Sequence, residues 1–239
     1  MNELTKIGMK HGTDKAGPQH NYTEVAYWQI LSPMKNENIK LLELGVGDTG
    51  ASIKMWREFM PNAKIGLFDP FFIVHPSVTV SKVELEELGV SVIVGNQLDR
   101  NDLSKVSSEF GDDIDVIIDD ASHVSDGMQK SLAMLFPLVK SGGYYIVEDL
   151  FSARDRDARL NDVNAWLNSS NVDHGNKEVI YHTREIHLAD VIDYFERTNK
   201  WLSLNLTESE KTYLEEHIDS CQIYRDYNNQ DNLVVIKKK

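Results

Sequence analysis

Short apolar segments separated by amphipathic ones predict an α/β protein with a mostly parallel sheet. Residues 39–44, 64–69, 90–95, 114–118 and 144–147 are short apolar runs. Runs of this kind, alternating with helical patterns, are typical of parallel strands that are buried on both faces. Consecutive strand–helix–strand units build such a sheet. The pattern therefore predicts five parallel strands with helices on both faces.

The first predicted helix lies near the start of the chain. Val25, Trp28 and Leu31 are spaced to share one face of a helix over residues 23–31, and Pro33 ends it. The spacing therefore predicts a helix with these three apolar side chains on one face.

Two further helices are predicted between strands. One covers residues 51–59 and the other residues 125–139, with Ser125 as its N-cap and residues 141–143 as its stop signal. Met128, Leu132, Leu135 and Phe136 form the apolar face of the second helix.

The last part of the chain has a different pattern. Residues 222–225 and 233–236 are strand-like, and the polar segment 226–232 between them is typical of a hairpin loop. The sequence therefore predicts a Rossmann-like, mostly parallel seven-stranded sheet that ends in an antiparallel hairpin.

The pattern indicates one domain over residues 1–239. Residues 1–22 are interpreted as an N-terminal arm or lid, and residues 151–200 as a substrate-facing insertion. His182 and His187 lie in the region that we expect to border the acceptor.

Composition narrows the choice of partners. The 239 residues include 25 Lys and Arg against 38 Asp and Glu, so the formal net charge is −13. Phosphate binding needs clustered cations, so neither nucleic acid nor an anionic membrane is an expected partner. Residues 237–239, the one dense basic run, are interpreted as a solvated tail. No stretch approaches the roughly 18 apolar residues that cross a bilayer.

The single cysteine indicates a reducing compartment. Cys221 cannot form an internal disulfide, which fits a cytoplasmic protein. It lies in a strand-like stretch, so we interpret it as structural and not as a nucleophile.

A glycine-rich turn follows the first strand. It begins at Gly45, includes Gly47, and opens a helix, which is typical of a nucleotide-containing cofactor site. Asp69 ends the next strand, where it would bind ribose hydroxyls. Glu43 precedes the turn, and its carboxylate suits an ammonium group better than a pyrophosphate. This favours S-adenosylmethionine over a dinucleotide as the cofactor. A tight turn that binds no ligand is the alternative. Asp99 is placed either to line an adenine pocket or to cap the next helix.

Two predicted strands each end in paired acids, Asp119-Asp120 and Glu148-Asp149. Carboxyl ends of neighbouring parallel strands meet at one edge of a sheet, where ligands bind. Converging carboxylates repel one another unless a cation lies among them, and oxygen ligands favour Mg²⁺ or a similar ion. Asp119 is expected to point away, since adjacent strand residues face opposite sides. His123 is expected over the same end of the sheet, where it could act as a general base, or else only hydrogen-bond the acids or cap the helix.

Three segments carry a resemblance to a known family. Residues 43–47 (ELGVG), 117–123 (IIDDASH) and 142–150 (GGYYIVEDL) resemble the metal-dependent sugar O-methyltransferases of macrolide biosynthesis, the mycinamicin type. Residues 12–15 (GTDK) and 20–23 (HNYT) are similar to the segment ahead of that family's catalytic domain.

The resemblance implies a class I methyltransferase fold with S-adenosylmethionine as cofactor. It also implies Mg²⁺ bound by Asp120, Glu148 and Asp149, with His123 as the general base. The residues expected to bind the cofactor are Glu43, Gly45, Gly47, Asp69, Asp99, Thr13 and Tyr22. For the arm, helix capping by Thr13 and a surface charge at Lys15 are the alternatives.

Two departures from the family are visible. Ala121 stands where the family usually has glycine, and the additional N-terminal domain of the mycinamicin enzyme is absent from this sequence. A homo-oligomer is compatible with the sequence, but the quaternary arrangement of that enzyme is not carried over.

The expected activity is O-methyl transfer to a sugar hydroxyl of a natural-product glycoside or a surface-polysaccharide precursor. Two neighbouring hydroxyls would chelate the metal, one would lose its proton to His123, and the alkoxide would attack the sulfonium methyl in line. A catechol or amine acceptor is one alternative. A non-catalytic scaffold that binds the cofactor is another.

Overall fold

The computed structural model describes residues 1–18, 20–71, 79–150, 186–225 and 231–239. Within these residues a seven-stranded sheet has the order β3-β2-β1-β4-β5-β7-β6. The parallel strands are β1 (Lys40–Leu44), β2 (Lys64–Asp69), β3 (Val90–Val94), β4 (Ile114–Asp119) and β5 (Val139–Glu148). The antiparallel hairpin consists of β6 (Ile218–Arg225) and β7 (Asp231–Lys238), with β7 paired to β5. The predicted architecture is confirmed.

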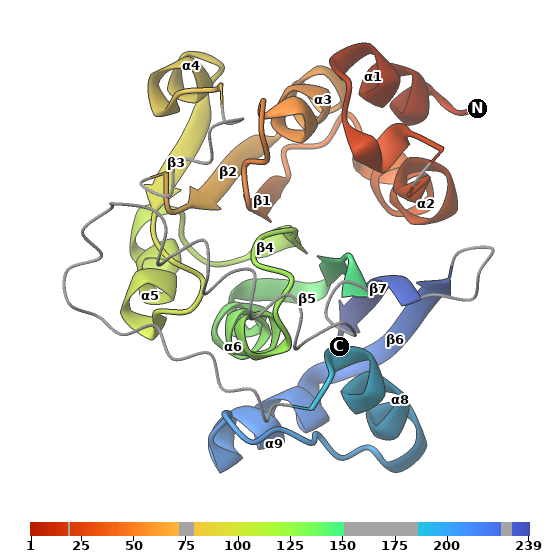
Figure 1. Cartoon of the computed structure of the whole chain (residues 1–239), viewed down its shortest axis with the longest axis vertical. Coiled ribbons are helices and arrows are strands. Elements are labelled where there is room, and N and C mark those ends of the chain that lie inside the picture. The colour runs from red at the N-terminus through yellow and green to blue at the C-terminus, as the bar shows by residue number, and fades with distance from the viewer. Residues whose placement is uncertain (19, 72–78, 151–185, 226–230) are drawn as a thin grey trace, which may run out of the picture.

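Helices cover both faces of the sheet (Figure 1). One layer contains α1 (Glu3–His11), α2 (Trp28–Leu31), α3 (Ala51–Phe59) and α4 (Lys82–Glu87). The other contains α5 (Arg100–Glu109), α6 (Ser125–Leu135), α8 (Leu188–Thr198) and α9 (Glu208–His217). Strand residues alternate between the two cores: Ile118 packs with the α1–α3 layer, and Ile117 packs with the α5–α6 layer. This alternation decides which strand-end side chains can meet.

The N-terminal segment is part of the core. Leu4 of α1 is fully buried, and a 3₁₀ turn, η1 (Asp14–Ala16), follows the helix. Next comes a π-helical turn, η2 (Thr23–Tyr27), which leads into α2 and a 3₁₀ turn, η3 (Ser32–Met34).

The π turn changes the face that the first predicted helix presents. Leu31 is fully buried but Val25 is 36% exposed, so the two do not share one buried face as the spacing predicts. Tyr22, Ala26 and Tyr27 are buried instead. A π turn has more residues per turn than the α-helix assumed by the spacing rule, so the apolar face shifts.

The predicted helix over residues 125–139 is shorter than expected. α6 ends at Leu135, and a 3₁₀ turn, η4 (Phe136–Leu138), leads directly into β5. Pro137 lacks the N–H needed to continue an α-helix, so the glycines expected to stop the helix lie inside the strand. Val124, and not Ser125, is the N-cap; the Ser125 hydroxyl accepts the Leu188 N–H at 2.8 Å.

The basic C-terminal run is not simply a solvated tail. Lys238 is 8% exposed, and its ammonium donates to the carbonyl oxygens of Phe136 (3.2 Å), Pro137 (3.0 Å) and Val139 (2.6 Å). The prediction was wrong because the lysine binds carbonyl oxygens of the η4 turn and of the first residue of β5.

Part of the expected insertion lies outside the described residues, namely 151–185, which include His182. The remainder contains α8, and the buried His187 is its N-cap, with Nδ1 accepting the Ala189 N–H at 3.2 Å. Across the described ranges we find no helix with the length and apolar character that crossing a membrane requires.

Candidate metal and cofactor site

Three carboxylates share one face of the sheet at its carboxyl edge. Glu43 on β1 is paired with Ile118 on β4, which faces the α1–α3 layer. Asp120 lies two residues beyond Ile118, and Glu148 lies two residues beyond Ile146, the β5 partner of Ile118. Because side chains alternate with a period of two, Glu43, Asp120 and Glu148 point to the same side.

A buried lysine lies among these carboxylates. Lys15 is 1% exposed; its Nζ is 2.8 Å from Glu148 Oε2 and 3.3 Å from Glu43 Oε1, and it also donates to Asp120 Oδ2. Burial alone lowers the pKa of Lys15, but the three carboxylates outweigh it and hold the pKa above its usual value. The interpretation of Lys15 as a surface charge was therefore wrong.

Glu43 already faces an ammonium group, and that group belongs to Lys15. The Oε2 atom of Glu43 accepts hydrogen bonds from Ser52 Oγ (3.0 Å) and Trp56 Nε1 (2.9 Å). Burial raises the pKa of Glu43 to about 6, against the opposing effect of Lys15. A direct contact between Glu43 and the cofactor stays a prediction.

Two tyrosines hold the acids that end β5. Tyr22 Oη donates to Asp149 Oδ1 at 2.6 Å and to the carbonyl oxygen of Asn232 at 3.3 Å. Tyr27 Oη donates to Glu148 Oε1. Burial, followed by the nearby carboxylates, raises the pKa of both phenols, so they stay protonated donors. The expected role of Tyr22 in cofactor binding stays a prediction.

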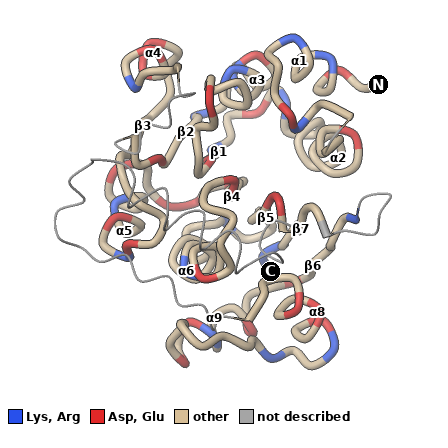
Figure 2. The backbone as a smooth tube through the Cα atoms, in the orientation of Figure 1, with Lys and Arg blue, Asp and Glu red and all other residues tan. Residues whose placement is uncertain are grey.

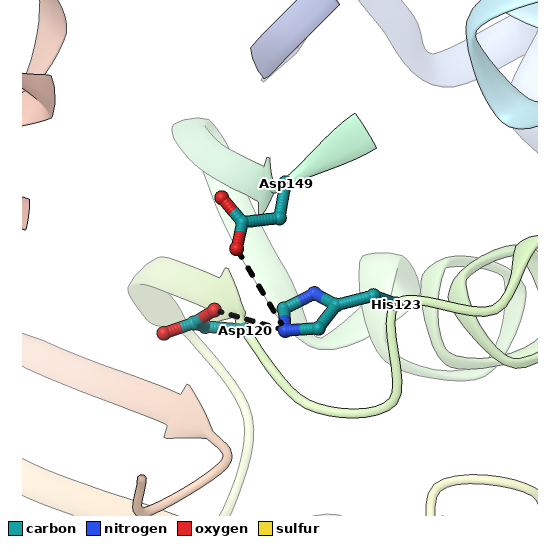
Figure 3. Close-up of side chains that lie close together, drawn as sticks. All are labelled: Asp120, His123 and Asp149. Carbon is teal, nitrogen blue, oxygen red and sulfur yellow. Dashed lines mark ion pairs between the residues drawn. The ribbon is translucent and has the colours of Figure 1, made fainter. Parts of the chain in front are cut away.

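The residues that can hold a metal are Asp120, His123 and Asp149 (Figure 3). One ligand atom from each lies within 4.8 Å of the others. His123 Nε2 is 3.7 Å from Asp120 Oδ1 and 3.9 Å from Asp149 Oδ2. The three side chains come from the end of β4, the loop before α6 and the end of β5.

The backbone is strained at two of these positions. His123 has φ 51° and Asp149 has φ 55°, in the left-handed region that non-glycine residues rarely adopt. Such conformations cluster at functional sites, where the surrounding structure holds them. In the described part of the chain, the buried Nδ1 of His123 has no hydrogen-bond partner.

The donor set fits a hard divalent cation. Carboxylate oxygens suit Mg²⁺ and Mn²⁺, and an imidazole nitrogen suits many divalent ions. Asp120 and Asp149 each direct one oxygen toward His123. Both oxygens of Glu148 are bonded, one to Lys15 and one to Tyr27, so its role as a direct ligand stays a prediction.

The glycine turn lies beside this cluster. Gly45 has φ 96°, and a Cβ there would lie 2.1 Å from the carbonyl oxygen of Asp120, so only glycine lets the ends of β1 and β4 approach. Gly47 has φ 58°, and a Cβ there would meet no described atom within 4 Å. Gly45 is therefore required for packing, and there is open space beside Gly47; the contact of either glycine with the cofactor stays a prediction.

The other expected cofactor residues border the turn or cap helices. Asp69 accepts the N–H groups of Val46 (3.0 Å) and Phe71 (2.7 Å), so it supports the turn, and burial raises its pKa. Asp99 is the N-cap of α5 and accepts the Asn101 N–H at 2.9 Å. The helix-cap interpretation of Asp99 is confirmed, and its contact with adenine stays a prediction.

Thr13 does not cap a helix through its side chain. It precedes η1, makes no side-chain capping hydrogen bond, and is 7% exposed. Its contact with the cofactor stays a prediction.

Asp119 faces away from the cluster, as expected. It accepts hydrogen bonds from Gln97 Nε2 (2.6 Å), Tyr145 Oη (3.0 Å) and the Ser131 hydroxyl, all in the α5–α6 layer or on the strand face that meets it. Burial raises the pKa of Asp119 to about 6.

Lys15 and Tyr27 are the site residues that sequence reasoning missed. One signal could have identified Lys15. Carboxylates that converge at the strand ends need a positive charge among them, and a lysine of the same chain can supply it. Tyr27 gave no signal, because its place beside Glu148 depends on the π turn.

No family model matches the chain. Among curated proteins, it is 33% identical over 157 residues to 8-demethyl-8-(2-methoxy-alpha-L-rhamnosyl)-tetracenomycin-C 3'-O-methyltransferase of Streptomyces olivaceus. It is 31% identical over 157 residues to mycinamicin VI 2''-O-methyltransferase of Micromonospora griseorubida. Each match covers 63% of this chain and 37% of the relative. The chain thus resembles sugar O-methyltransferases of tetracenomycin and macrolide biosynthesis, which confirms the predicted resemblance, over little more than a third of their length.

Solved structures confirm the fold. The MycE methyltransferase from the mycinamycin biosynthetic pathway, in complex with Mg and SAH, superposes with a TM-score of 0.67 at 23% identity, covering 99% of this chain and 53% of that one. The same enzyme with Mg, SAH and mycinamycin VI gives a TM-score of 0.65 at 23% identity, covering 99% and 54%. The Rossmann-like methyltransferase fold is therefore established.

Proposed function

We propose that this protein is an S-adenosylmethionine-dependent and divalent-metal-dependent O-methyltransferase. Its acceptor would be a sugar hydroxyl in a natural-product glycoside or a surface-polysaccharide precursor. The observation that carries the proposal is the identity of 31–33% to enzymes named as O-methyltransferases of glycosylated natural products. The cluster of Asp120, His123 and Asp149 at the carboxyl edge of the sheet supports it independently.

In this proposal Mg²⁺ or a similar cation is held by Asp120 and Asp149 through the oxygens that face His123. Glu148 is the third proposed ligand, and its direct coordination requires its Oε2 to exchange the contact with Lys15. A bound divalent ion lowers the pKa of a hydroxyl and stabilises negative charge on its oxygen.

His123 is the proposed general base. Its Nε2 lies between the carboxylates of Asp120 and Asp149, which supports a role for the imidazole beside the proposed cation. A neutral imidazole can accept a proton from an acceptor hydroxyl held beside it. The residues thus provide positioning and charge stabilisation for in-line transfer.

The cofactor is proposed to lie along the glycine turn. Gly47 has space beside its backbone, and Asp69 ends the neighbouring strand where ribose hydroxyls would bind. Cytoplasmic location and self-association are further proposals, and light scattering tests the second. The acidic residues are interspersed with basic ones over the helices of both layers (Figure 2), which supports a small-molecule partner rather than a nucleic acid.

Conversion of S-adenosylmethionine to S-adenosylhomocysteine tests the proposal. The acceptor panel contains nucleotide sugars, a macrolide glycoside, a catechol and an amine, with and without Mg²⁺. We expect turnover with a sugar acceptor that stops in excess EDTA and in Asp120→Asn. The control is Asp113→Asn, an exposed aspartate that also has a left-handed φ, of 57°.

The possible outcomes separate the alternatives. Turnover only with the catechol or the amine would replace the sugar acceptor. Cofactor binding without turnover on any acceptor would favour a scaffold. Full activity of Asp120→Asn, or of the wild type in EDTA, would remove the metal from the proposal.

A further inference from the structure

Two candidate ligands, Asp120 and Asp149, each have one carboxylate oxygen bonded to the N-terminal segment and one turned toward His123. Asp120 uses Oδ2 for Lys15 and directs Oδ1 toward His123. Asp149 uses Oδ1 for Tyr22 and directs Oδ2 toward His123. A carboxylate held at one oxygen has a fixed orientation at the other, so these contacts determine where the free oxygens lie.

We name Lys15, Tyr22 and Tyr27 the carboxylate clamp. Their exposed fractions are 1%, 1% and 0%, so the core holds them in place. Lys15 Nζ joins Asp120 to Glu148, and Tyr27 holds the second oxygen of Glu148. In this arrangement Glu148 holds Lys15 beside Asp120.

The π turn lets both tyrosines of the clamp face the acids. The turn is defined by the hydrogen bond from the Trp28 N–H to the Thr23 carbonyl oxygen, five residues apart. In a regular α-helix, residues five apart such as Tyr22 and Tyr27 lie roughly 140° apart around the axis. The wider π turn reduces this angle, so Tyr22 reaches Asp149 while Tyr27 reaches Glu148. Single π turns of this kind are frequent at functional sites.

We propose that the carboxylate clamp positions the metal ligands, with Tyr22 aiming Asp149 and Lys15 aiming Asp120 at the cation position beside His123. The clamp residues do not touch the cation; they act through the ligands. This inference rests on the metal site of the proposed function. Residues that orient metal ligands in this way typically change affinity by 10–100-fold when they are removed.

Tyr22→Phe is the variant that tests the proposal. It removes only the hydroxyl that Asp149 accepts and keeps the buried ring, so the core stays filled. The matched control is Tyr145→Phe, which removes a hydroxyl that donates to Asp119, the neighbouring carboxylate on the opposite face. Both variants lose one hydrogen bond from a buried tyrosine to a carboxylate, but only one of those carboxylates is a candidate ligand.

The measurements are binding of Mn²⁺ alone by calorimetry, binding of S-adenosylhomocysteine, and urea denaturation. We expect Tyr22→Phe to weaken Mn²⁺ binding by roughly tenfold or more. Tyr145→Phe should bind Mn²⁺ like the wild type, although both variants lose stability. Affinity for S-adenosylhomocysteine should be unchanged in Tyr145→Phe, and its value in Tyr22→Phe tests the predicted cofactor contact of Tyr22 separately.

Four results would overturn the inference. Equal Mn²⁺ affinity in wild type and Tyr22→Phe shows that the clamp does not position the ligands. Equal weakening in Tyr22→Phe and Tyr145→Phe shows a general structural effect. Weaker S-adenosylhomocysteine binding with unchanged Mn²⁺ binding makes Tyr22 a cofactor contact. A wild type that binds no Mn²⁺ overturns the proposed metal site as well, which separates the two failures.

Discussion

Asp119 and Asp120 are neighbours in the chain, yet they lie in opposite environments at the end of β4. Asp119 faces the α5–α6 layer and is 1% exposed, and its hydrogen-bond donors are the neutral groups of Gln97, Ser131 and Tyr145. Asp120 faces the α1–α3 layer, bonds to the ammonium of Lys15, and keeps one oxygen directed toward His123.

The difference shows that a buried carboxylate is not in itself a site. The hydrogen-bonding capacity of Asp119 is used by fixed neutral donors, which gives a closed structural network. Around Asp120, the single ammonium of Lys15 is paired with three carboxylates, those of Glu43, Asp120 and Glu148. The Oδ1 atom of Asp120 is directed toward His123 and away from Lys15. A cation is therefore attracted to one face of the sheet and not to the other.

The largest expected effect is the loss of the buried ammonium. Lys15→Met leaves Glu43, Asp120 and Glu148 without their cation, and breaking a buried ion pair from one side costs about 3–5 kcal/mol. Urea denaturation measures the change. The control is Lys10→Met, since Lys10 pairs with Glu58 at an exposed position. Equal losses in the two variants would mean that Lys15 is not the counter-charge of the cluster.

A smaller effect is expected on the closed face. Ser131→Ala removes one of the donors to Asp119, which leaves a buried carboxylate oxygen less well bonded. We expect a loss of about 1–3 kcal/mol in the free energy of unfolding. Binding of Mn²⁺ should equal that of the wild type. Weaker Mn²⁺ binding would show that the two faces are coupled and that the comparison fails.

The pH dependence of stability isolates Glu43. Burial raises its pKa from 4.5 to about 6 in the folded state, so the folded state binds a proton between these values and the unfolded state does not. The contribution of Glu43 is therefore fully present below pH 4.5 and is lost as pH rises through 6, by about 2 kcal/mol in all. Glu43→Gln lacks this slope. Parallel stability curves for the variant and the wild type from pH 4.5 to 7 would contradict the assignment.

The smallest effect is expected at Asp99, which caps α5. Asp99→Ala should cost about 1 kcal/mol, because one N–H of the first turn loses its acceptor. Thermal denaturation measures this loss. A fall in S-adenosylmethionine affinity would support the predicted contact of Asp99 with adenine, and an unchanged affinity would leave helix capping as its role.

Local pattern predicted much of the fold. The five parallel strands and the hairpin were identified because period-two and apolar-run patterns depend on neighbouring residues alone. Boundaries were less accurate at β5, where Gly142 and Gly143 belong to the strand. Val25 was misplaced because the helical spacing rule assumes an α-helix and the structure has a π turn there.

The candidate site was predicted in part for the same reason. Strand-end acids must meet at the carboxyl edge of a parallel sheet, and alternation decides that Asp119 and Asp120 point apart. No local rule predicts which oxygen of each carboxylate accepts a hydrogen bond, or which side chain donates it. Glu148 could be placed beside Asp120 from the sequence, but its contacts with Lys15 and Tyr27 could not.

The sequence by itself determined the order of strands and helices, the face of each strand-end acid, and the resemblance to sugar O-methyltransferases. Only the tertiary structure decided that Lys15, 105 residues from Asp120 in the chain, lies buried against it. It also decided that Lys238 binds the carbonyls after α6. The physical reason is that a charged side chain is buried only where distant segments pack together to pair it, and that pairing belongs to the whole fold.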